Sequence, residues 1–132
     1  MSSPLNATDA IHQIITEGGI TLQLDARNNT YRSVGGDYWY FPVAPDATVI
    51  IDGSRLEAGF HDFVTSNRQV LMQDDTYLGV WRNPSDSKYY LDICTRDTDH
   101  DRALTTARSI SDKSDRTIKS IYNPEQDATI AL

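Results

Sequence analysis

The chain has 132 residues with 39% hydrophobic content and a formal net charge of −7, which predicts one folded domain over residues 1–132 and excludes wholesale disorder. The acidic balance argues against duplex nucleic acid or an anionic membrane as the main partner, because both need a basic face. No apolar run approaches the roughly 18 residues that span a bilayer and no signal peptide is recognisable, so we expect a cytoplasmic protein.

The first half of the chain predicts a helix followed by strands. Residues 8–17 carry an apolar stripe at helical spacing that ends at Gly18. Four strands are then expected, over residues 20–24, 31–34, 37–43 and 48–51. The second and third of these flank Gly35-Gly36, a pair that suits the loop of a two-strand hairpin.

The second half predicts two helices and four more strands. The first helix starts with Ser54 and Glu57 at the spacing of a capping box, and the second, over residues 98–109, starts with Thr98 and Asp101. The strands are expected over residues 77–82, 88–94, 117–122 and 128–132. This order predicts a single α+β domain, a mainly antiparallel sheet built from hairpins with about three helices packed on it.

Two blocks of sequence carry a recognisable series of strand and helix motifs. The motifs are the strands at residues 18–25, 78–81, 89–93 and 120–122 and the helix that contains Ala103 and Ala107. Together they resemble a family of uncharacterised small proteins encoded by phages and prophages of actinobacteria. Ser120 stands where that family usually has alanine, and residues 112–116 are more charged than its connector. The resemblance implies a phage or prophage origin and a consistent fold, and it carries no functional residue.

No catalytic or metal-binding motif is recognisable in the sequence. Asp97, Asp99 and Asp101 have the spacing that opens a calcium loop, but Arg102 and Arg108 stand where that loop needs glycine and glutamate. These acids are therefore expected at the start of a helix. The three histidines lie far apart and lack the spacing of a zinc site. We expect no metal and no cofactor, and the missing catalytic motifs favour a protein that is not an enzyme.

Aromatic residues at 38–41 are the main candidate for a partner-binding surface. On a strand, Tyr38 and Tyr40 face one side and Trp39 the other. Either this strand is central and buried on both sides, or the tyrosines are exposed beside Tyr31, across the hairpin, and form a contact surface. The partner-binding candidates are Tyr31, Tyr38, Trp39 and Tyr40. The leading hypothesis is thus a non-enzymatic phage or prophage accessory protein that binds a host or phage protein, for example as an inhibitor.

The competing hypothesis is a small-molecule or nucleotide-binding protein, or an enzyme whose site is not visible in sequence. Its pocket would lie between the sheet and the helices, where arginine side chains suit an anionic ligand. The ligand-binding candidates are Trp81, Tyr89, Tyr90, Arg96 and Arg102. An acidic mimic of DNA is a weaker third hypothesis, because a net charge of −7 is modest for this length. A homo-oligomer through an exposed strand edge is compatible with the sequence, and no feature requires it.

Overall fold

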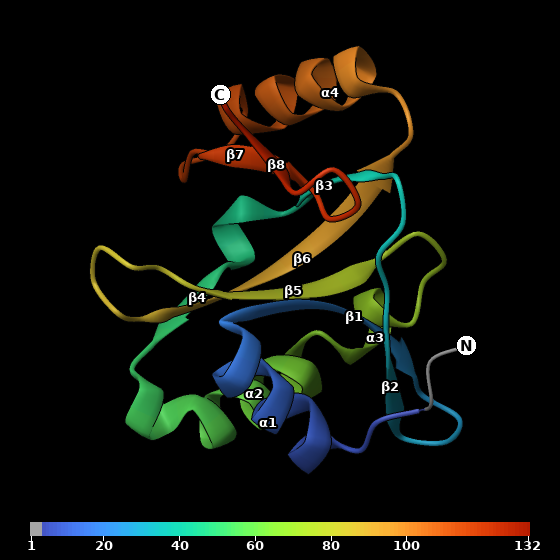
Figure 1. Ribbon diagram of the computed structural model, residues 1–132, viewed down its shortest axis with the longest axis vertical. Coiled ribbons are helices and arrows are strands. Elements are labelled where there is room, and N and C mark those ends of the chain that lie inside the picture. Colours follow the sequence, from blue (N-terminus) through green and yellow to red (C-terminus); the bar gives the residue numbers. More distant parts are fainter. Residues whose placement is uncertain (1–3) are drawn as a thin grey trace.

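The computed structural model describes residues 4–132, which form one antiparallel sheet of eight strands with helices packed against it (Figure 1). The helices are α1 (Ala7–Glu17), α2 (Leu56–Ser66), α3 (Arg68–Leu71) and α4 (His100–Asp112), with the short 3-10 helices η1 (Pro45–Ala47) and η2 (Gly53–Arg55). The strands are β1 (Gly19–Asp25), β2 (Thr30–Ser33), β3 (Trp39–Pro42), β4 (Val49–Ile51), β5 (Tyr77–Arg82), β6 (Tyr89–Asp97), β7 (Ser120–Asn123) and β8 (Ala128–Ala131). The α+β fold class predicted from the sequence is confirmed.

The sheet has the strand order β2-β1-β5-β6-β3-β7-β8, and β4 pairs with β6 outside this path. At nine residues β6 is the longest of these strands. It pairs with β5 along one edge, while its other edge is divided between β4, which opposes residues 89–91, and β3, which opposes residues 94–97. This edge of β6 therefore changes partners at residues 92 and 93.

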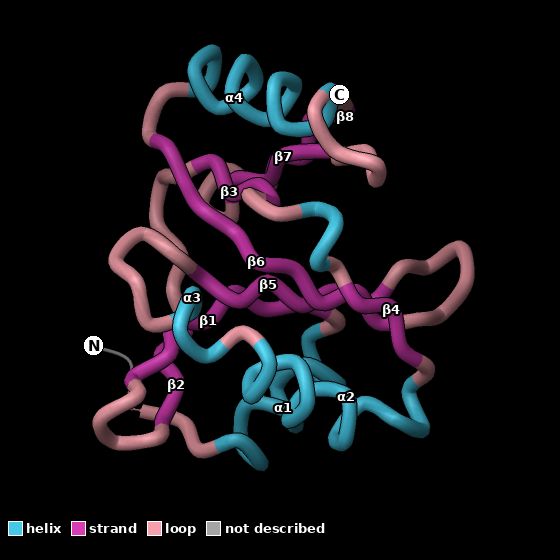
Figure 2. The backbone as a smooth tube through the Cα atoms, turned by 180° about the vertical axis from the view of Figure 1, so that it is seen from behind, coloured by secondary structure: helices cyan, strands magenta, loops and turns pink. Residues whose placement is uncertain are grey.

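Two apolar clusters hold the helices on one face of the sheet. The helices α1, α2 and α3 pack over β1, β5 and β6 around Phe60, and α4 packs over β3 and β7 around Phe41. Figures 1 and 2 show α4 at one end of the molecule, α1 and α2 at the opposite end, and α3 between them. Because Phe41 opposes Thr95 on β6, side-chain alternation places it on the same face as Ile93 in the other cluster. The opposite face of the sheet lies away from both of these clusters.

The apolar stripes predicted from the sequence form the core in most places. Leu78 and Val80 on β5 and Leu91 on β6 are buried on the face covered by α1 and α2, as strand alternation predicted. On α1 the fully buried position is Ile14, whereas its predicted neighbour Ile15 is 59% exposed. The buried stripe of α1 is therefore narrower than the sequence pattern indicated.

The predicted hairpin around Gly35-Gly36 is wrong. The strand β2 pairs with β1 through the turn at residues 26–29, and β3 pairs instead with β6 and β7. The connection from β2 carries the chain past β1, β5 and β6 to β3, which lies near α4 (Figure 1). The glycines serve this crossing: Gly36 takes a φ of 85°, and the Gly35 carbonyl accepts a hydrogen bond of 2.8 Å from the Tyr40 hydroxyl.

The helix starts also differ from the predicted caps. The capping box of Ser54 and Glu57 does not form, because α2 begins after η2 and its N-cap residue Arg55 makes no side-chain bond. At α4 the cap is Asp99, one residue after the predicted Thr98, and its carboxylate accepts a hydrogen bond from a backbone N–H of the first turn. In addition, α3 is not among the helices predicted from the sequence.

Gly79 on β5 lies against Cys94 on β6, and a Cβ atom added at residue 79 would lie 2.8 Å from the Cys94 sulfur. We expect Gly79→Ala to lower the free energy of unfolding by about 1–3 kcal/mol, because overpacking forces neighbouring atoms apart. Cys94→Ala removes the sulfur, so the double variant should lose less stability than the two single variants added together. Urea unfolding of all four proteins measures this, and additive losses would contradict the close contact.

Candidate functional site

The face of the sheet opposite the two helix clusters is concave and borders a cleft of about 1070 Å³. The cleft is lined by residues of β1, β5, β6, β3 and β7, by α1, and by the loop between α4 and β7. Its volume lies at the upper end of small-molecule sites, which measure about 300–1,000 Å³. The side chains on β5 and β6 and the cations on the loop give this cleft its chemical character.

Trp81 and Tyr90 form an aromatic pair on the floor of the cleft. They oppose each other across β5 and β6, with ring centroids 5.0 Å apart and an angle of 34° between the ring planes. The Tyr90 hydroxyl donates a 2.8 Å hydrogen bond to Asp86 and accepts one of 3.3 Å from Asn83, so the loop between the two strands holds this ring. Trp81 is 36% exposed. The aromatic pair therefore offers a fixed ring surface to the cleft.

Asp92 lies beside the aromatic pair, two residues along β6 from Tyr90 and on the same face of the sheet. Its carboxylate accepts a hydrogen bond from the Thr48 hydroxyl. Burial raises the pKa of the Asp92 carboxyl, and the Thr48 bond and the charge of Arg116 oppose that rise without cancelling it. The Asp92 carboxyl can therefore act as a hydrogen-bond acceptor and, when protonated, as a donor.

Two cationic side chains stand at the rim of the cleft, on the loop between α4 and β7. The Arg116 guanidinium donates a 2.8 Å hydrogen bond to the Thr48 carbonyl. The Lys119 ammonium lies 5.8 Å from the centroid of the Tyr90 ring. The two acids that line the cleft, Glu17 and Asp92, are matched in number by these cations. The cleft is therefore not acidic, although the chain carries a net charge of −7.

The rim loop is fixed by Asp46 of η1. Its carboxylate accepts hydrogen bonds from the backbone N–H groups of Arg116, at 2.8 Å, and of Asp115, at 3.3 Å. At its far end, the Lys119 carbonyl accepts a 3.0 Å hydrogen bond from the backbone of Leu132. These bonds hold the backbone that carries both cations, so the rim is anchored on two sides of the sheet.

Arg96 and three tyrosines close one end of the concave face. The guanidinium carbon of Arg96 lies 3.8 Å from the ring centroid of Tyr38 and 4.8 Å from that of Tyr77, and its Nη1 donates a 3.1 Å hydrogen bond to the Tyr40 hydroxyl. Within residues 4–132 no carboxylate forms an ion pair with Arg96. Cation–π contacts and the hydrogen bond thus tie β3 to β5 and β6 next to the cleft.

The cleft does not lie between the sheet and the helices, where the sequence placed the pocket, but on the opposite face of the sheet. Two of the predicted ligand-binding residues, Trp81 and Tyr90, line it. Tyr89 faces the other way and is buried in the core between the sheet and α2, so its assignment to a pocket is wrong. Arg102 lies on α4, where its guanidinium donates hydrogen bonds of 2.6 and 2.7 Å to the Asp97 carboxylate. Arg96 belongs to the tyrosine cluster at the end of the face and is not among the residues that line the cleft.

The predicted partner surface of Tyr31, Tyr38, Trp39 and Tyr40 is not an exposed surface. Tyr31 is 4% exposed, and Trp39 and Tyr40 are each 5% exposed. Tyr38 is half-buried against an arginine side chain. Of the two alternatives, β3 is the central strand covered on both sides, and Tyr31 does not lie across a hairpin from it. Binding of a host or phage protein stays a prediction from sequence.

Sequence reasoning missed four polar residues of the cleft: Thr48, Asp92, Arg116 and Lys119. Asp92 had a usable signal, because an acid between Leu91 and Ile93 in a strand must face away from their core. The other three had no local signal, since η1, β4 and the loop before β7 reach the cleft only through long-range pairing.

The acids at the start of α4 act as helix-start residues. The Asp97 carboxylate bonds Arg102 and a backbone N–H, and Asp99 caps the helix. In the part of the chain that the structure describes, no three His, Cys, Asp or Glu side chains are arranged to hold a metal ion. The calcium-loop spacing of these acids is therefore accounted for by the fold.

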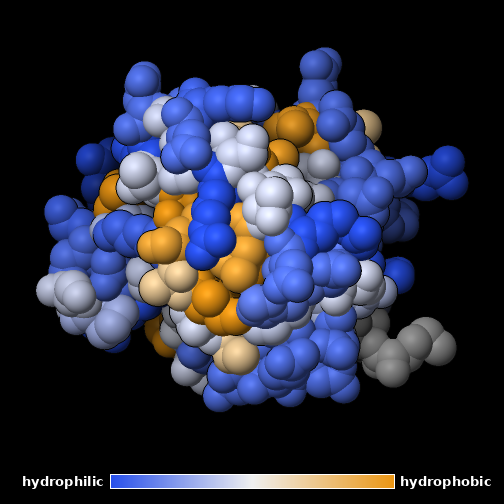
Figure 3. All heavy atoms as spheres, turned by 90° about the horizontal axis from the view of Figure 1, so that it is seen from above, coloured by the Kyte–Doolittle hydropathy of each residue, from blue (hydrophilic) through white to orange (hydrophobic). Residues whose placement is uncertain are grey.

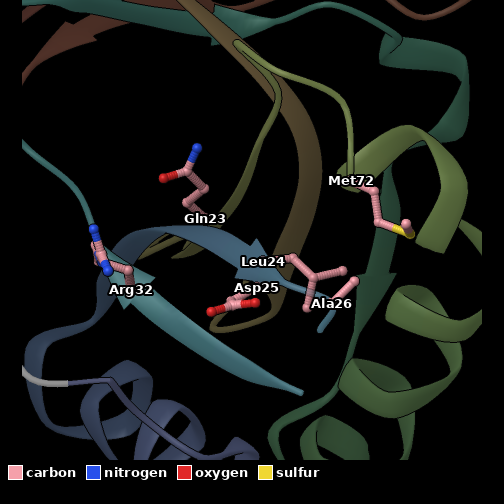
Figure 4. Close-up of a pocket in the computed structure, with 6 residues that line it drawn as sticks. All are labelled: Gln23, Leu24, Asp25, Ala26, Arg32 and Met72. Carbon is pink, nitrogen blue, oxygen red and sulfur yellow. The ribbon is translucent and has the colours of Figure 1, made fainter. Parts of the chain in front are cut away.

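A smaller hollow of about 290 Å³ lies at the β1–β2 edge of the sheet. Figure 4 shows the residues that line it, which come from the two strands, the turn after β1 and the end of α3: Gln23, Leu24, Asp25, Ala26, Arg32 and Met72. The Asp25 carboxylate already accepts two hydrogen bonds from Asn28, which lower its pKa. We therefore take the larger cleft as the candidate site.

Neither the outer surface of the molecule nor comparison with known proteins changes the choice of the larger cleft as the candidate site. In Figure 3 the face seen from above is mostly hydrophilic, with a patch of apolar side chains bordered by hydrophilic ones. None of the helices described between residues 4 and 132 combines the length and apolar character needed to cross a bilayer. Comparison of the chain with protein-family models, curated proteins and solved structures found no match. The functional argument therefore rests on the cleft.

The Asp92→Asn variant should differ from the wild type in how its stability depends on pH. Burial raises the pKa of Asp92 above its unfolded value, so the wild type loses stability as the pH rises from about 4 through the folded pKa. Asparagine has no proton to lose. The free energy of unfolding of the variant, relative to the wild type, should therefore increase over that interval.

Urea unfolding at a series of pH values measures this difference. Asp74→Asn, at an exposed position outside the cleft, is the matched control for loss of one negative charge. If the Asp92→Asn difference were independent of pH, the Asp92 carboxyl would not be desolvated in the folded protein.

Proposed function

We propose that this protein binds a small organic molecule, without covalent chemistry, in the cleft on the concave face of its sheet. The aromatic pair carries the proposal. Its two rings lie 5.0 Å apart, and the loop between β5 and β6 holds the Tyr90 ring, so a third ring can stack on a partly ordered site. Ring surface with nearby polar groups is the usual composition of ligand sites.

The cysteine that lines the cleft is in a state that suits binding rather than catalysis. Cys94 lines the cleft, but it is 7% exposed, and burial raises the pKa of its thiol well above the usual range. A thiol in that state is a poor nucleophile, since the thiolate is the reactive form. Asp92 and the rim cations provide hydrogen bonds and charge for a ligand, which suits recognition.

Trp81→Ala tests the proposal directly. A panel of single-ring and fused-ring heterocycles, neutral and anionic, is screened by thermal unfolding, because a ligand that binds the folded state raises the melting temperature. For any heterocycle that binds, the variant should lose affinity by about tenfold or more, as one stacking face is gone. Ile15→Ala, on the outer face of α1, is the control for loss of an exposed apolar side chain.

The indole N–H signals of the two tryptophans locate the binding in solution. A ring in the cleft should shift the signal of Trp81 and leave that of Trp39, which is buried under α4, nearly unchanged. No stabilisation by any member of the panel, or shifts confined to residues outside the cleft, would refute the proposed function.

A further inference from the structure

A cation and an acid of the cleft both lie near the aromatic pair. Lys119 places its ammonium 5.8 Å from the centroid of the Tyr90 ring. Its side chain is exposed and makes no ion pair within residues 4–132. An ammonium with three donors and no acidic partner, held at the rim by the backbone bond to Leu132, is suited to an oxyanion.

Hydrogen-bonding groups also lie beside the aromatic pair. Asp92 lies two residues from Tyr90 on the same face, about 7 Å along the strand, which is within reach of the edge of a ring stacked on the pair. The Thr48 hydroxyl bonds one carboxyl oxygen of Asp92, and the second oxygen makes no hydrogen bond within residues 4–132. That oxygen can pair with an N–H group on a nitrogen heterocycle.

We propose that the ligand is a nitrogen heterocycle that bears one anionic group, of the nucleoside monophosphate class. The ring stacks on Trp81 and Tyr90, its hydrogen-bonding edge meets Asp92, and the anionic group is bound by Lys119. This inference rests on the proposed function and adds the chemical class of the ligand. A cleft of about 1070 Å³ leaves room for the sugar between ring and anion.

The test uses the full chain and isothermal titration with the monophosphates of adenosine, guanosine, cytidine and uridine, each beside its neutral nucleoside. At least one monophosphate should bind about tenfold or more tightly than its nucleoside, because one charge-assisted contact is added. The advantage of the monophosphate should shrink as salt is raised, since the rim is exposed to solvent.

Three variants assign the parts of the ligand to the parts of the cleft. Lys119→Gln should reduce the affinity for the monophosphate to that for the nucleoside and leave the nucleoside unchanged. Trp81→Ala should lower the affinity for both the monophosphate and the nucleoside. Lys113→Gln, which removes an exposed lysine outside the cleft, is the charge-matched control and should change neither.

Two results would overturn the inference, and they separate it from the proposed function. Equal affinity for nucleoside and monophosphate, unchanged in Lys119→Gln, would leave a ring site and remove the anion site. No binding of any nucleoside or monophosphate would exclude this ligand class, and the heterocycle panel would then decide whether the cleft binds another kind of ring.

Discussion

Strand β6 organises the sheet, because in the described part of the chain it alone pairs with three other strands. One of its faces supplies Leu91 and Ile93 to the core, and the other supplies Tyr90 and Asp92 to the cleft. A shift of its register by one residue would exchange these faces and bury the acid. The constraint that keeps the core apolar is thus the same one that keeps the polar group of the site in the cleft.

The charges on the concave face differ from those of the chain as a whole. An acidic chain would be expected to present acidic surfaces, yet the concave face combines a desolvated carboxyl with two cations on a loop. That loop is held by Asp46, an acid whose oxygens are used by backbone N–H groups. Because an acid such as Asp46 is hydrogen-bonded outside the cleft, the cleft can bind an anionic ligand that the net charge of the chain alone would disfavour.

Local sequence patterns predicted most of the helices and strands, but they could not predict which strands pair when these lie far apart in the sequence. Alternation placed Leu78 and Leu91 in the core, and helical spacing located α1. Gly35-Gly36 resembled a hairpin loop, because a pair of glycines shows only that the chain can turn there. The strand β3 pairs instead with β6 and β7, which lie far along the sequence. Trp81 and Tyr90 could be grouped from the sequence, because they lie on β5 and β6, two consecutive strands that form a hairpin.

Thr48, Arg116 and Lys119 could not be assigned to the cleft from the sequence, and the long-range pairing of the strands explains why. Gly19 opposes Trp81 and Trp39 opposes Asp97, so each strand that flanks the β5–β6 hairpin closes a long loop. Closing such loops sacrifices chain entropy before the contacts form, which slows folding. In kinetic terms the hairpin can form first, with both of its edges unpaired and able to join a second chain. The same long-range architecture that creates the concave face therefore exposes the protein to misassembly while that face is still incomplete.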